Sequence, residues 1–116
     1  MHELSRRILI IDTEPDLLSS LHELLEMSGY DVTTLSDLRQ IFNICVAKPF
    51  DVVLSHWVYP YLKVDEVFDQ LKIQYPNTKF VIMTGSIEIQ DQIEKKYPFL
   101  YKPFQLSELE NVLKST

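Results

Sequence analysis

Four short apolar segments, each ending at a polar residue, constrain the fold of this chain more than any other feature. The segment ILII ends at Asp12, DVVLS at His56, FVIM at Thr84, and FLY at Lys102. Such nearly continuous apolar runs are typical of strands that are buried on both faces of a parallel sheet. Because ligands of these sheets bind at the carboxyl ends of the strands, we expect these four residues and Glu14 to lie at one site.

Helical patterns separate the apolar segments and indicate repeated βα units with right-handed crossovers. The predicted strands are 6–11, 30–35, 51–55, 79–83 and 99–101. The first predicted helix begins at Pro15 and is ended by Gly29, and the second is capped by Ser36 and ends before Pro49. The third covers 64–75 and the fourth covers 88–96. The last begins near Ser107, with Glu110 as the capping-box partner of this serine. This order predicts an α/β fold of the flavodoxin-like doubly wound (βα)5 type, with parallel strands in the order 2-1-3-4-5.

Apolar residues at helical spacing predict which helix faces are buried. On the first helix the apolar residues are Leu17, Leu18, Leu21, Leu24 and Leu25. On the second they are Leu38, Ile41, Phe42, Cys45 and Val46. The single cysteine therefore falls on an inner face, and we interpret it as a small buried hydrophobic residue.

Length and composition favour one compact domain over 1–116 and exclude several classes of partner. The chain has 116 residues, of which 46% are hydrophobic, which is enough to bury a core. No apolar run approaches the roughly 20 residues of a membrane span, and the N-terminus MHELSRR is not followed by the longer apolar region of a signal peptide, so we expect a cytoplasmic location and no membrane partner. The net charge of -6, from 17 acidic and 11 basic residues, argues against direct nucleic-acid binding.

The motifs ILIIDTEP, DVVLSHWVYP, FVIMTG and FLYKPF together resemble those of the response regulator receiver domains of two-component systems, the CheY-like family. The resemblance covers essentially the whole chain. It implies a phosphorelay signalling module rather than an enzyme. In that family an acidic cluster holds Mg²⁺, an aspartate after the third strand accepts phosphate, and a hydroxyl and a lysine contact the phosphoryl group.

The resemblance assigns these roles to individual residues of this chain. Asp12 and Glu14 match the acidic cluster, Thr84 matches the hydroxyl residue, and Lys102 matches the lysine. Pro103 matches the proline that follows that lysine.

Two residues depart from the family pattern. His56 occupies the position of the phosphoacceptor aspartate, and Thr13 stands where the family has a second metal-binding aspartate. Mg²⁺ prefers carboxylate oxygens, so these changes predict weak or absent Mg²⁺ binding, with Asp12 and Glu14 as weak candidate ligands. Aspartyl phosphorylation needs a carboxylate nucleophile, so the chain is predicted to be a degenerate pseudo-receiver.

The role of His56 has three interpretations. It could accept phosphate itself, or form a transition-metal site with Asp12 and Glu14. Either would make the chain a phosphotransfer protein or a metal-dependent enzyme. The interpretation that we favour is structural: His56 fills the acceptor's place and hydrogen-bonds to Asp12 or Thr84, while Asp12 neutralises Lys102.

Without its own phosphorylation, the module is predicted to act through protein contacts. The family resemblance implies a histidine kinase, an output domain or another signalling protein as partner, and a homodimer through the fourth helix, fifth strand and fifth helix. Phe99 matches the family's switch aromatic. Trp57 and Tyr59 lie in an aromatic loop beside the site, where they serve either as an interface or as a cover for the core.

Overall fold

The computed structural model describes residues 6–47, 49–57, 63–85 and 97–114, and its strands form one parallel sheet. The strands are β1 (Arg7–Ile11), β2 (Asp31–Leu35), β3 (Val52–His56), β4 (Lys79–Thr84) and β5 (Phe99–Tyr101). Their order is β2-β1-β3-β4-β5, and every neighbouring pair is parallel. The predicted sheet and strand order are therefore confirmed.

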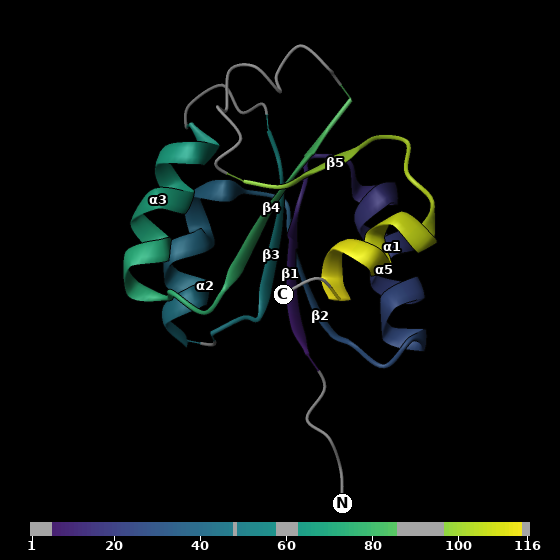
Figure 1. Cartoon of the computed structure of the whole chain (residues 1–116), viewed down its shortest axis with the longest axis horizontal. Helices are drawn as coiled ribbons and strands as arrows, with labels where there is room; N and C mark the ends of the chain where they lie inside the picture. Colours follow the sequence, from purple (N-terminus) through teal and green to yellow (C-terminus); the bar gives the residue numbers. More distant parts are fainter. Residues whose placement is uncertain (1–5, 48, 58–62, 86–96, 115–116) are drawn as a thin grey trace, which may run out of the picture.

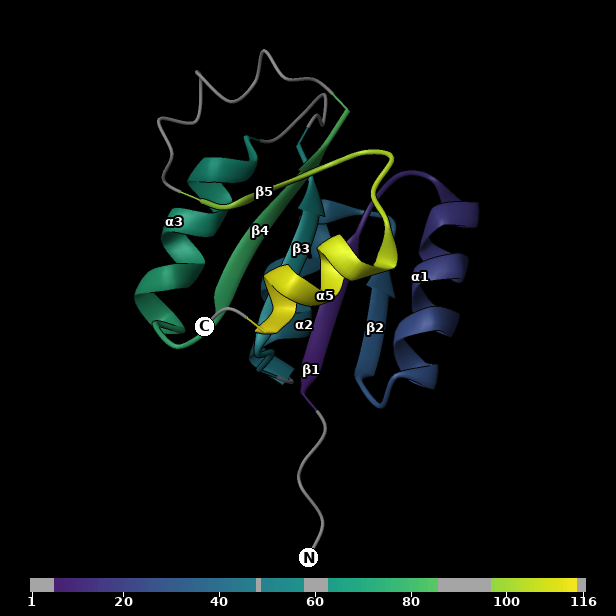
Figure 2. The same ribbon diagram turned by 45° about the vertical axis from the view of Figure 1, so that its right-hand side comes forward.

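Helices cover both faces of the sheet, as a doubly wound fold requires. They are α1 (Pro15–Met27), the 3-10 turn η1 (Leu38–Gln40) continued by α2 (Ile41–Ala47), α3 (Val64–Gln74) and α5 (Leu106–Lys114). Figure 1 shows α2 and α3 on one face of the sheet and α1 and α5 on the other, and the turned view in Figure 2 agrees. The helix predicted over 88–96 lies outside the described residues.

The core consists of two apolar layers, one on each face of the sheet, and the interior strand β1 contributes side chains to both. Ile8 and Ile10 belong to the layer under α1 and α5, whereas Leu9 and Ile11 belong to the layer under α2 and α3. All four side chains are fully buried. Successive side chains of β1 point to opposite faces of the sheet, so this one strand contributes to both layers. Burial on both faces explains why its apolar run is uninterrupted.

Two helix caps differ from the sequence prediction. The second helix is capped by Asp37 rather than Ser36, because the chain first makes the 3-10 turn, and the Asp37 carboxylate accepts a hydrogen bond of 3.0 Å from the Arg39 N–H. The last helix begins at Leu106 rather than Ser107. Its third residue is therefore Glu108.

The Glu108 side chain makes the return bond of a capping box at the start of α5. Its Oε1 accepts a hydrogen bond of 3.2 Å from the Gln105 N–H, which leaves Glu110 outside this cap. The end of α1 follows the prediction, because Gly29 has a φ of 95°, a left-handed conformation that glycine adopts without strain.

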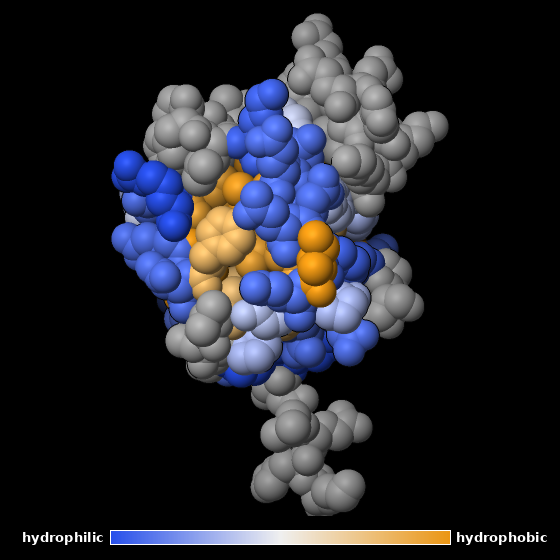
Figure 3. Space-filling model, turned by 90° about the vertical axis from the view of Figure 1, so that its left-hand side faces the viewer, coloured by the Kyte–Doolittle hydropathy of each residue, from blue (hydrophilic) through white to orange (hydrophobic). Residues whose placement is uncertain are grey.

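The face of α2 and α3 carries apolar surface among polar side chains (Figure 3). Phe42, which the pattern placed on the inner face of its helix, is 36% exposed, while Leu38, Ile41 and Cys45 are buried as predicted.

The single cysteine, Cys45, is not a reactive thiol. Burial raises the pKa of the Cys45 thiol to about 11, so this thiol stays protonated and unreactive near neutral pH.

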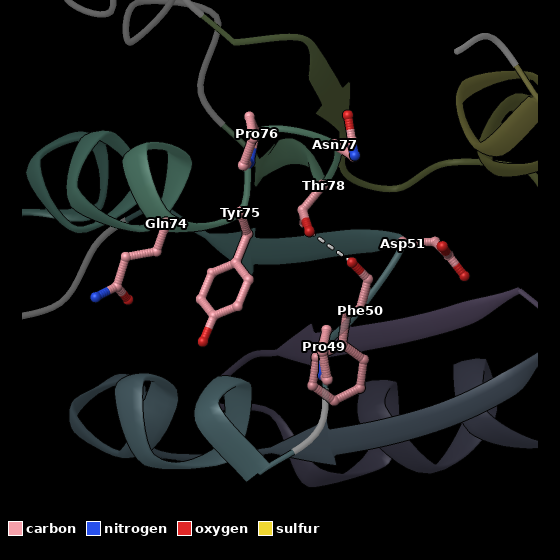
Figure 4. A pocket seen from close by; sticks show the side chains of 8 residues that line it. All are labelled: Pro49, Phe50, Asp51, Gln74, Tyr75, Pro76, Asn77 and Thr78. Atoms are coloured by element: carbon pink, nitrogen blue, oxygen red, sulfur yellow. Dashed lines mark hydrogen bonds between the residues drawn. The ribbon is translucent and has the colours of Figure 1, made fainter.

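A small pocket of about 290 Å³ lies at the amino ends of β3 and β4 (Figure 4). The Thr78 hydroxyl donates a hydrogen bond of 2.6 Å to the Phe50 carbonyl and ties the two loops together there. The pocket lies at the amino ends of the strands, so it is separate from the edge where ligands of such folds bind.

Candidate functional site

Four predicted site residues lie at the carboxyl ends of four strands. Asp12 directly follows β1, His56 ends β3, Thr84 ends β4, and Lys102 directly follows β5. In Figure 1 this edge of the sheet is at the top. The parallel topology therefore places the residues along one edge, and side-chain contacts decide which of them meet.

Asp12 is the buried anchor of the site. Its side chain is fully inaccessible to solvent, and its Oδ2 lies 2.5 Å from the Lys102 Nζ. Its Oδ1 accepts a hydrogen bond of 3.1 Å from the Glu14 N–H. Both carboxylate oxygens are thus engaged within the chain. A buried carboxylate needs such partners, because an uncompensated charge in the interior is strongly unfavourable.

His56 joins this pair through the lysine and not through the aspartate. The Lys102 Nζ lies 3.2 Å from the His56 Nδ1, whereas the Nδ1 lies 3.9 Å from the Asp12 Oδ2. An ammonium group only donates, so the Nδ1 accepts and the neutral ring carries its proton on Nε2. Of the two partners predicted for His56, Asp12 is ruled out as a hydrogen-bond partner of the Nδ1, because 3.9 Å is too long for such a bond. The predicted neutralisation of Lys102 by Asp12 is present.

The environment of His56 favours the neutral imidazole. Burial lowers the pKa of His56 below 6.5, and the nearby Lys102 charge lowers it further, while Asp12 and Glu14 act in the opposite direction. The ring is therefore uncharged at neutral pH.

Acidification from about pH 7.5 to about pH 5.5 is expected to lower the free energy of unfolding, in part through His56. Between its lowered pKa and 6.5, the unfolded state binds more protons at this residue than the folded state, so stability falls as the pH falls through that window. Urea unfolding at both pH values should show a smaller pH dependence for His56→Asn than for the wild type. His22→Asn is the control, because His22 lies at an exposed site of α1. In this variant the part of the pH dependence of unfolding that His56 contributes should persist. An unaltered dependence in His56→Asn would contradict this assignment.

The remaining residues of the predicted pocket differ in exposure. Thr84 is 2% exposed, and its carbonyl accepts a hydrogen bond of 2.8 Å from the Lys102 N–H, which fixes the lysine backbone beside β4. Thr13 and Glu14 are exposed at the start of α1. The site thus has a closed, charge-paired interior and an open side next to α1.

A metal site made of His56, Asp12 and Glu14 finds no support in this geometry. Among the residues that the structure describes, no three His, Cys, Asp or Glu side chains are placed to hold a metal ion. The Lys102 ammonium already contacts both the Asp12 and the His56 side chains. A shared metal would have to displace that charge.

Two of the predicted switch and interface residues, Trp57 and Phe99, pack on the layer under α2 and α3. Trp57 and Phe99 are half-buried against that layer, and the Trp57 N–H donates a hydrogen bond of 3.2 Å to the Met83 carbonyl. The Phe99 ring stacks on Tyr101 with centroids 5.9 Å apart. Tyr59 lies outside the described residues. Packing therefore accounts for much of the Trp57 and Phe99 side chains, and an interface role stays a prediction.

A doubly wound sheet with a buried aspartate and a lysine paired at its carboxyl edge defines a receiver-type signalling domain. The family model for the response regulator receiver domain matches residues 8–114. This chain belongs to the response regulator receiver family.

Curated relatives are longer proteins of which this chain covers one part. It is 30% identical over 102 residues to the C4-dicarboxylate transport transcriptional regulatory protein DctD of Pseudomonas aeruginosa, covering 84% of this chain and 22% of that protein. It is 29% identical over 90 residues to the alkaline phosphatase synthesis transcriptional regulatory protein PhoP of Bacillus subtilis, covering 78% of this chain and 38% of that protein.

Solved structures agree with the fold. The beryllofluoride-activated NtrC4 receiver domain dimer superposes with a TM-score of 0.82 at 28% identity, covering 93% of each chain. Chemotaxis response regulator CheY4 of Vibrio cholerae superposes with a TM-score of 0.83 at 23% identity, covering 95% of this chain and 97% of that one, a likeness of fold. Within the described part of the chain, no helix has the length and apolar character to cross a membrane.

Proposed function

We propose that this chain is a pseudo-receiver: a cytoplasmic signalling module in which residues 1–116 form one receiver-like domain that works without phosphorylation at position 56. The observation that carries the proposal is the contact between the Lys102 Nζ and the His56 Nδ1 at 3.2 Å. Where the family has a carboxylate nucleophile, this chain has a neutral imidazole whose inward-facing nitrogen accepts a hydrogen bond from the lysine. That nitrogen's lone pair is engaged, so it is not available to attack a phosphoryl group.

The same arrangement disfavours the Mg²⁺ ion that the family uses. Magnesium needs several hard oxygen ligands, usually with one or two carboxylates. Both oxygens of Asp12 already accept bonds, from Lys102 and from the Glu14 N–H. Thr13 supplies no carboxylate. The residues present do not fit the ion, so our proposal contains no step that depends on it.

The output of such a module depends on protein contacts. A partner shifts a receiver between conformations only if it binds one of them more tightly. A histidine kinase, an output domain or another signalling protein fits this role. The NtrC4 receiver is a dimer in its activated state. By analogy, we propose a homodimer through β5, α5 and the segment between β4 and β5.

Incubation with acetyl phosphate and Mg²⁺, or with beryllofluoride and Mg²⁺, tests the proposal directly. We expect no stable mass increase of one phosphoryl group and no change in the backbone amide spectrum with beryllofluoride. A stoichiometric adduct that His56→Ala removes would contradict the proposal. A receiver domain with an intact acceptor aspartate, treated in parallel, shows that the reagents are active.

A further inference from the structure

A groove of about 560 Å³ opens beside Asp12, His56 and Lys102, between α1 and the segment that joins β5 to α5. Figures 1 and 2 both show this segment crossing from β5 towards α1 before α5 begins. Leu17 and Leu24 of α1 form one apolar wall, and Phe104 forms the other. The volume lies in the range of small-molecule sites, which in open α/β sheets occur at this edge.

One face of α1 supplies the length of the groove. Leu17, Leu21 and Leu24 are spaced by four and three residues, so they lie along one stripe of the helix. At the rise of an α-helix, these leucines extend for about 10 Å, and Glu14, the cap residue before α1, lines the groove beyond them. Leu24 is 42% exposed although it belongs to this apolar stripe. The stripe therefore offers open apolar surface with a carboxylate at one end.

The charges at that end favour a cation. Asp12 and Lys102 neutralise each other, and His56 is uncharged near neutral pH. Glu14 is exposed at the mouth of the groove, and its side chain makes no cap on α1. Among the described charged groups that line the groove, the negative charge of Glu14 is the one left without a compensating partner. A carboxylate or phosphate ligand would meet repulsion there, whereas an ammonium group would be attracted.

We propose that this groove binds a small amphipathic amine, whose apolar body lies along Leu17 and Leu24 against Phe104 and whose protonated amine pairs with Glu14. Such a ligand covers apolar surface that the folded chain leaves open, which is favourable in proportion to the area removed from water. His56 and Lys102 also line the groove, so the bound amine lies beside position 56. The proposal therefore rests on the proposed function in one respect, namely that position 56 carries no phosphoryl group.

Three probes of matched shape test the chemistry: 6-phenylhexylamine, 6-phenylhexanol and 6-phenylhexanoate. Each is titrated into the isotope-labelled full chain while backbone amide shifts are followed. We expect the amine to bind with a dissociation constant on the order of 1 mM, the alcohol more weakly, and the carboxylate most weakly. The shifts should gather on α1 and on the chain after β5.

Three variants separate the contributions of the groove. Leu24→Gln removes exposed apolar surface and should weaken binding of the amine about fivefold. Glu14→Gln should weaken it about threefold and remove its advantage over the alcohol. Met27→Gln is the matched control, because Met27 is 84% exposed on the same helix outside the groove, and it should leave binding unchanged.

Several outcomes would overturn the proposal. Tighter binding of the carboxylate than of the amine would exclude the charge argument. Equal effects of Met27→Gln and Leu24→Gln, or amide shifts confined to other elements, would exclude the location. If none of the probes binds and Leu24→Gln abolishes a concentration-dependent dimer in sedimentation, the occupant of the groove is a second copy of the chain.

Discussion

Replacing Lys102 by methionine is expected to lower the free energy of unfolding by about 3–5 kcal/mol, because it leaves a buried charge without its partner. The Asp12 carboxylate has no exposed surface, and its Oδ2 lies 2.5 Å from the Lys102 ammonium. Methionine preserves much of the apolar stem of the lysine, so the loss measures the charge rather than the packing. Urea unfolding near pH 7.5, followed by circular dichroism, gives the difference between variant and wild type.

Two further variants show whether the effect comes from the pair. Asp12→Asn combined with Lys102→Met removes both charges and should recover most of the lost stability, since a neutral pair avoids the uncompensated charge. Lys114→Met removes a lysine that is 71% exposed and lies 4.0 Å from Glu110, so it should change stability by less than about 1 kcal/mol. If Lys102→Met proved as mild as Lys114→Met, the buried pair would not have the role that we assign to it.

The sheet could be predicted from the sequence because the pattern that specifies it, an apolar strand followed by an amphipathic helix, is local and recurs along the chain. A strand such as β1, with four consecutive fully buried residues, can exist only with both faces covered, and helical patterns between the strands supply the cover. The helix ends were less certain. Ser36 and Asp37 are both good caps, and only the 3-10 turn at Leu38 decides between them.

The site was harder to predict than the sheet because long side chains decide it. The sequence places Asp12, His56 and Lys102 at one edge, since the ends of parallel strands meet there. It does not fix where the Lys102 ammonium lies, which depends on the flexible side chain and the depth of the aspartate. The contact between Lys102 and His56 was therefore missed, and a histidine contact with Asp12 or Thr84 was predicted instead. The groove was missed because a leucine stripe on α1 reads as core, although Leu24 is 42% exposed.

Combining His56→Asp with Thr13→Asp is expected to raise the affinity for Mg²⁺ by on the order of 100-fold, because two carboxylates join the anionic end of the site. An aspartate at position 56 would accept from Lys102 where the imidazole now does, and would also present a free oxygen to a cation. Thr13 is exposed at the start of α1, so a carboxylate there costs little desolvation. Fluorescence of Trp57, the single tryptophan of the chain, can follow the titration from the residue next to position 56.

The charge-free pair His56→Asn with Thr13→Ser is the matched control, since it changes the same two positions and adds no carboxylate. It should bind Mg²⁺ as weakly as the wild type. With acetyl phosphate and Mg²⁺, the acidic double variant should also gain one phosphoryl group on the new carboxylate at position 56, because Thr84 and Lys102 remain in place. If the acidic variant gained no Mg²⁺ affinity while keeping its fold, the two substitutions would not explain the loss of receiver chemistry. Another feature of the chain, such as the Lys102 ammonium beside Asp12, would then have to exclude the ion.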